Sequence, residues 1–138
     1  MAVSVNIEKN FRDFSLKVQF EGSSAAIGLL GASGSGKSMT LRCIAGIETP
    51  DRGKIVINGK TVFDSEAGIN LKPQKRQIGY LFQNYALFPN MNVFDNVAYG
   101  LKVKKVPKAE IKERVTEMLK LVQLEGFGKR RITQMSGG

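Results

Sequence analysis

The chain contains no histidine and only one cysteine, Cys43. Without histidine, it has no serine–histidine or cysteine–histidine nucleophilic site and lacks the usual ligand of most transition-metal centres. A single cysteine excludes an internal disulfide and a zinc site built from thiolates, and Cys43 falls in a predicted helix, which favours a buried packing role. The remaining chemistry is that of positioning by backbone amides, hydroxyl groups and charged side chains.

Long hydrophobic runs are also missing. No stretch is long and apolar enough to cross a bilayer, and residues 1–6 (MAVSVN) have neither the charged nor the apolar region of a secretory signal. We therefore expect a cytoplasmic protein. Its 138 residues, 42% of them hydrophobic, are enough for one modest domain with a buried core.

Residues 31–38 (GASGSGKS) have the spacing of a phosphate-binding loop. They follow a strand-like apolar run at 25–30 (AAIGLL) and precede a helical pattern at 38–47. A flexible turn that happened to contain a lysine would predict neither neighbour, so the context favours a phosphate site. The sequence therefore predicts that the chain binds a nucleoside triphosphate.

Each residue type in this loop has a chemical reason to be there. The glycines allow backbone N–H groups to turn inward without a Cβ clash. Lys37 supplies a positive charge for the β- and γ-phosphates, and the Ser38 hydroxyl is a ligand for Mg²⁺. The N-terminal dipole of the following helix favours the same anion.

The formal net charge of +9 is concentrated in residues 102–138, which hold 10 basic and 4 acidic side chains. Such a basic segment could bind the phosphates of a nucleic acid. However, no aromatic residue lies among the lysines at 102–108, and only Phe127 lies near the basic residues at 129–131. We interpret the segment as a solvated charged face, and nucleic acid is an unlikely partner.

Alternation and turn residues predict a β-rich first part and a helical second part. Apolar residues alternate at 14, 16, 18 and 20, which places Phe14 in the core. Asn58 and Gly59 predict a tight hairpin within 54–63. The remaining expected elements are a strand at 3–7, a surface loop at 64–73, a short buried strand at 77–82, and a helix that begins near Pro107, runs to Leu124 and is stopped by Gly126.

Three motifs follow one another in a fixed order: the loop at 31–38, Gln83 within LFQNYALFP, and QMSGG at 134–138. Together they resemble the ATP-binding subunits of ABC transporters over essentially the whole chain. The phrases GIETPDRG and NVAYGL resemble the bacterial importers of oxyanions, such as molybdate or sulfate, and of polyamines, and among these we favour the molybdate type. The resemblance implies an α/β P-loop NTPase fold, with a β subdomain and P-loop core in residues 1–82 and the Q-loop and part of a helical subdomain in 83–138.

The resemblance also implies roles for individual residues. Lys37 and Gln83 would be catalytic, and Ser38 and Gln83 would contact Mg²⁺. Phe11 is the best candidate for the aromatic residue that stacks on adenine, whereas Met39 replaces a hydroxyl that many members offer to the α-phosphate. The residues expected to bind ATP are Phe11, Gly31, Ser33, Gly34, Gly36, Lys37, Ser38 and, from the signature motif of the opposite subunit in a homodimer, Ser136, Gly137 and Gly138.

The apolar stretch 85–91, from Tyr85 at its start to Met91 at its end, is similar to the family surface that receives the membrane-spanning permease. A loop packed on the core would explain this stretch equally well. The resemblance places the protein on the inner face of the cell membrane, as a peripheral subunit.

The family's Walker B strand, catalytic glutamate and switch histidine come after the signature motif and are not among these residues. We therefore expect that the chain does not hydrolyse ATP alone, that part of its apolar surface is uncovered, and that it is marginally stable and prone to associate. Three alternatives stay open: a soluble ABC ATPase of DNA repair or translation, a basic nucleic-acid-binding module, and an inert remnant.

Overall fold

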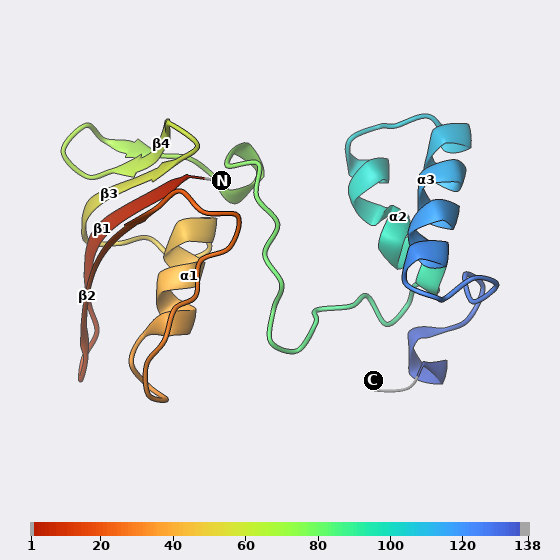
Figure 1. Ribbon diagram of the computed structural model, residues 1–138, viewed down its shortest axis with the longest axis horizontal. Helices are drawn as coiled ribbons and strands as arrows, with labels where there is room; N and C mark the ends of the chain where they lie inside the picture. Colours follow the sequence, from red (N-terminus) through yellow and green to blue (C-terminus); the bar gives the residue numbers. More distant parts are fainter. Residues whose placement is uncertain (1, 136–138) are drawn as a thin grey trace. The chain divides into compact units, whose positions relative to one another are not determined.

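A computed structural model describes residues 2–135 and divides the chain into two compact units, residues 1–80 and 81–138. In the described part, the first unit contains a sheet and one α-helix, and the second contains two α-helices (Figure 1). Each unit has its own hydrophobic core.

The first unit is built on an antiparallel sheet whose strands follow the order β2-β1-β3-β4-β5. In β1, Val5 and Ile7 point into the core and alternate with polar residues that face outward. The helix α1 covers the inner face of this sheet, where its Cys43 is fully buried, as predicted (Figure 1). The elements are β1 (Val3–Asn10), β2 (Ser15–Gly22), α1 (Lys37–Ala45), β3 (Arg52–Ile57), β4 (Lys60–Asp64), β5 (Ile69–Asn70) and the 3₁₀ helix η1 (Pro73–Lys75).

The predicted hairpin is confirmed between β3 and β4. Asn58 and Gly59 both have left-handed backbone angles, with φ of 49° and 76°, as a two-residue hairpin turn requires. A second glycine, Gly53, has φ of 110° and lies so close to the carbonyl of Asn6 in β1 that a Cβ would collide with it. The close pairing of β1 and β3 therefore depends on glycine at this position.

Two predicted strands are wrong. Residues 25–30 and 77–82 do not form strands, and Leu30 and Leu81 are 99% and 77% exposed. A strand requires a hydrogen-bonded neighbour, and no strand within residues 2–135 pairs with either segment. Ile27 and Ile78 instead line an apolar pocket of about 220 Å³ between the sheet and α1. The predicted loop 64–73 also contains a short strand, β5, which pairs with β4.

The second unit consists of α2 (Val93–Val103), α3 (Lys108–Leu121) and the 3₁₀ helix η2 (Ile132–Gln134). Its core is formed by residues from both α-helices, which are Val93, Ala98, Ile111, Val115 and Leu119. The predicted helix after Pro107 is confirmed, but it ends at Leu121, because Gln123 already has a left-handed φ of 60°. No helix in the described part has the length and the apolarity to span a bilayer.

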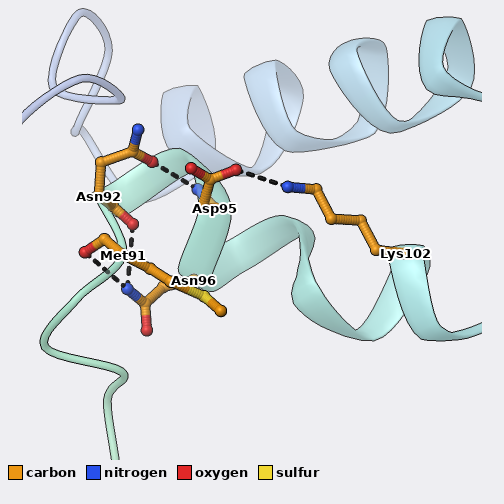
Figure 2. A network of polar contacts seen from close by, with 5 residues as sticks. All are labelled: Met91, Asn92, Asp95, Asn96 and Lys102. Atoms are coloured by element: carbon orange, nitrogen blue, oxygen red, sulfur yellow. Dashed lines mark hydrogen bonds and ion pairs between the residues drawn. The ribbon is translucent and has the colours of Figure 1, made fainter.

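The helix α2 was not expected from the sequence. The side chain of Asn92 caps this helix and accepts a hydrogen bond of 2.7 Å from the backbone N–H of Asp95 (Figure 2). The acidic side chain of Asp95 in the first turn also suits the positive end of the helix dipole. These two residues were the sequence signal for the helix.

Candidate nucleotide-binding site

The loop 31–38 leads directly into the N-terminus of α1. Gly34 and Gly36 have φ of 81° and 88°, which is the left-handed region that glycine adopts without strain. The amide of Thr40 donates to the carbonyl of Gly36 at 2.8 Å and starts the helical hydrogen bonds. The glycines therefore set the path of the loop into the helix.

The first amides of α1 are not paired within the described part of the chain. Within residues 2–135, no group accepts a hydrogen bond from the backbone N–H of Gly36, Lys37 or Ser38, and no side chain caps this helix. These donors lie at the positive end of the helix dipole, which is a ready-made site for an anion.

Lys37 is half-buried and its ammonium group is held above the loop. Its Nζ donates to the carbonyls of Gly31 and Ala32, at 2.7 Å each, and lies 3.3 Å from the Oγ of Ser35. A Cβ added at Gly31 would come within 2.7 Å of the same Oγ, so a larger residue here would displace the Ser35 side chain. The positive charge of Lys37 is thus fixed beside the unpaired amides.

Two phenylalanines lie next to this loop. The rings of Phe11 and Phe14 stack at 6.1 Å between centroids, with 22° between their planes, and the Nζ of Lys9 lies 5.4 Å from the centre of the Phe11 ring. The prediction that Phe14 lies in the core is wrong: it is 40% exposed. It lies just before β2, in the turn closed by the hydrogen bond from Phe11 N to Phe14 O, and Leu16 takes the core position instead.

Ser33, Gly34 and Ser38 are exposed, whereas Met39 packs against the core of the first unit. The hydroxyl of Ser38 lies in the first turn of α1, next to the free amides. Mg²⁺ bound with a nucleotide keeps several waters and phosphate oxygens and needs few protein ligands. One serine hydroxyl at this position therefore suits a Mg²⁺–phosphate group.

Gln83 belongs to the second unit, where it begins an exposed turn. The next residues are conformationally unusual: Tyr85 and Ala86 have φ of 61° and 46°. Ser136, Gly137 and Gly138 lie outside the described residues.

Two further residues, which were not expected to be important from the sequence, make several side-chain hydrogen bonds each. The first is Arg76, which is 3% exposed, and the second is Asn96 in α2. An arginine in a polar segment carries no sequence signal of burial. By contrast, Asn96 begins the phrase NVAYGL, on which the family resemblance partly rests, so the sequence did carry a signal for it.

A mixed α/β unit, a glycine-rich loop that opens a helix, and a lysine fixed over unpaired helix amides define a P-loop nucleotide-binding domain. The chain belongs to the ABC transporter family, whose model matches residues 12–138. The resemblance and the fold class predicted from the sequence are thereby confirmed.

Individual relatives agree with this family. The chain is 46% identical, over 96% of its length and 43% of the relative's, to a molybdate/tungstate import ATP-binding protein of Methanocaldococcus jannaschii. It is also similar to sulfate/thiosulfate import ATP-binding proteins of Thermosynechococcus vestitus (46% identity; 96% of this chain and 39% of the relative) and Synechocystis sp. (47%; 96% and 37%). The chain thus spans only about two fifths of the length of these relatives.

Proposed function

We propose that the chain binds Mg²⁺–ATP through residues 31–38, as part of the subunit that energises an ABC importer. The observation that carries this proposal is the group of three unpaired amides, Gly36, Lys37 and Ser38, beside the fixed ammonium of Lys37. This arrangement offers hydrogen bonds and positive charge to the phosphates.

The roles proposed for the remaining residues are those that the family resemblance implies. Ser38 ligates Mg²⁺, and Phe11 stacks on the adenine, with Phe14 behind it as a support. Gln83 contacts Mg²⁺ or the attacking water. Ser136, Gly137 and Gly138 serve the γ-phosphate of the opposite subunit in a homodimer, and the complete protein hydrolyses ATP during transport.

The transported substrate we propose is an oxyanion, because relatives named for molybdate/tungstate and for sulfate/thiosulfate import match almost the whole chain. Within this class we favour molybdate. An importer subunit of this kind works in the cytoplasm, peripherally on the inner face of the membrane.

The stretch 85–91 supports a membrane-spanning permease as partner. Its side chains Tyr85 and Leu87 are 66% and 51% exposed, which argues against a loop packed on the core. The stretch is nevertheless fixed at its middle residue, because the ring centroids of Phe88 and of Tyr99 in α2 lie 4.5 Å apart. An apolar surface held in one conformation suits docking to another protein.

A backbone amide NMR titration of the labelled chain with Mg²⁺–ATP tests the nucleotide site. Saturable shifts at Gly34, Gly36 and Ser38 are expected in the wild type and should be lost in Lys37→Ala. Lys72→Ala is the matched control, because Lys72 is exposed in the same unit and its side chain has no hydrogen bond or ion pair within residues 2–135. A well-dispersed spectrum that does not respond to ATP would contradict the proposal.

A further inference from the structure

The C-terminal end of α1 is held by a buried cation. The Nη1 of Arg76 donates to the carbonyls of Cys43 and Ile44, at 2.8 and 2.9 Å, and the whole residue is only 3% exposed. These carbonyls belong to the last turn of the helix, where backbone acceptors have no helical partner. Arg76 therefore completes the end of α1 that lies opposite the phosphate-binding loop.

The other donors of Arg76 connect this helix end to the segment after β4. Its Nε donates to the carbonyl of Leu71 at 2.8 Å, and its Nη2 donates to the Oδ1 of Asn70 at 3.1 Å. No carboxylate within residues 2–135 forms an ion pair with it. Burial lowers the pKa of the guanidinium, yet arginine stays charged in proteins, so carbonyl dipoles must balance the charge.

Gly46 makes room for this cation. A Cβ at Gly46 would lie 2.5 Å from Nε and 2.8 Å from Cζ of Arg76, and the residue has a left-handed φ of 77°. Its amide donates to the carbonyl of Cys43 at 3.1 Å, which closes the helix. The glycine thus both ends α1 and admits the guanidinium to the carbonyls of its last turn.

The N-terminal end of α1 is also held by a tertiary contact. A Cβ at Gly36 would collide with Leu16, so the start of α1 lies directly against β2. A helix of nine residues is too short to be stable alone, and its direction depends on such tertiary contacts. As long as its own hydrogen bonds hold, the helix moves as one body. Releasing its C-terminus therefore changes the direction in which the amides at its N-terminus point.

We propose that Arg76 is a positioning residue for the phosphate site, because it fixes the C-terminal carbonyls of α1 and thereby aims the amides of Gly36, Lys37 and Ser38. The nature of the ligand rests on the proposed function, whereas the effect on the helix does not. Arg76 acts through α1 and touches no phosphate.

Amide hydrogen exchange in the full chain, without nucleotide, tests this role. In Arg76→Gln, exchange of the Thr40 amide, which donates to Gly36, should become about tenfold faster than in the wild type, whereas the amides paired between β1 and β3 should change much less. Arg42→Gln is the matched control: it removes an exposed charge from the same helix turn, and within residues 2–135 its side chain has no hydrogen bond or ion pair. Arg42→Gln should change the exchange rate neither of the Thr40 amide nor of the amides paired between β1 and β3.

Binding provides a second readout. The affinity of Arg76→Gln for Mg²⁺–ATP should fall about tenfold and that of Arg42→Gln should not, and millimolar methylguanidinium should restore much of the loss in Arg76→Ala. Asn70→Ala removes one hydrogen-bond partner of Arg76 and should show the same pattern more weakly. This variant serves as the test if the Arg76 variants fold poorly. Equal acceleration of Thr40 and the sheet amides in both Arg76→Gln and Asn70→Ala would overturn the proposal. A wild-type chain that does not bind ATP would refute the proposed function, while the exchange comparison would still decide the role of Arg76.

Discussion

The ring of Phe14 lies against the backbone of Gly36, since a Cβ added at Gly36 would come within 3.3 Å of the ring atom Cζ. Phe11 stacks on the same ring. The aromatic pair therefore packs against Gly36, the residue directly before α1. The aromatic pair and the phosphate-binding loop thus lie side by side, so they can bind the base and the phosphates of one nucleotide.

The first prediction concerns Phe11. Replacing it with leucine should weaken Mg²⁺–ATP binding about tenfold, because stacking on a base contributes roughly 1–3 kcal/mol. Isothermal titration would measure the change. Inorganic triphosphate has no base to stack, so its affinity should be the same in Phe11→Leu and in the wild type. A parallel loss of both affinities would show that Phe11 supports the loop and does not bind adenine.

Gly36 and Gly34 form a matched pair for a second prediction. Both have left-handed φ, but a Cβ at Gly36 would collide with Leu16, whereas one at Gly34 would meet no atom within 4 Å. Gly34→Ala should therefore cost only the backbone strain, about 1–2 kcal/mol. Gly36→Ala should cost more in urea unfolding, because the start of α1 must also move away from β2. Equal costs would mean that the contact with Leu16 is easily relieved.

The elements predicted correctly were those whose signals are local. The strand expected at 3–7, the turn at Asn58 and Gly59 and the helical spacing before Leu121 depend only on neighbours in the chain. The phosphate-binding loop was recognisable for the same reason, since its glycines and Lys37 act within a few residues of one another.

The features that were missed or wrongly predicted depended on distant partners or on the residue at which an element begins. Residues 25–30 are apolar enough for a strand, but hydrogen-bonded pairing requires a neighbour that the described residues do not provide. Phe14 fits the alternation of β2, yet it lies one residue before the strand begins. Arg76 is buried through contacts with carbonyls more than thirty residues away in α1, which no local pattern indicates.

The pH dependence of stability gives a third prediction. Hydrogen bonds from the amides of Ala67 and Glu66 and the nearby ammonium of Lys54 lower the pKa of Asp64 below its ordinary value of 3.8. A lowered pKa in the folded state means that the carboxylate stabilises the protein above pH 4 and that this contribution is lost as the pH falls through the folded-state value. Urea unfolding between pH 2 and 6 should therefore show a smaller acid-induced loss in Asp64→Asn. A loss as large as that of the wild type would assign the acid sensitivity to other carboxylates.

The last prediction concerns the stretch 85–91 and the residue that fixes it. The side chain of Asn96 accepts a hydrogen bond from the amide of Phe88 at 2.9 Å, and its Nδ2 donates to the carbonyls of Phe88 and Met91, at 3.1 and 3.2 Å. Figure 2 shows this amide group directed at the backbone before α2, while Asp95 and Lys102 pair along the helix. Asn96 is thus the link between the apolar stretch and a rigid element.

Asn96→Ala should destabilise the second unit by about 1–3 kcal/mol, because several hydrogen bonds are lost together. The Phe88 amide should then exchange faster, and binding of any partner at 85–91 should weaken without a change in ATP affinity. Lys102→Met is the control, since it removes an exposed ion pair of 2.6 Å in the same helix and should cost less than about 1 kcal/mol. If the Phe88 amide exchanges at the wild-type rate in Asn96→Ala, the conformation of the stretch is set by the contact between Phe88 and Tyr99 and not by Asn96.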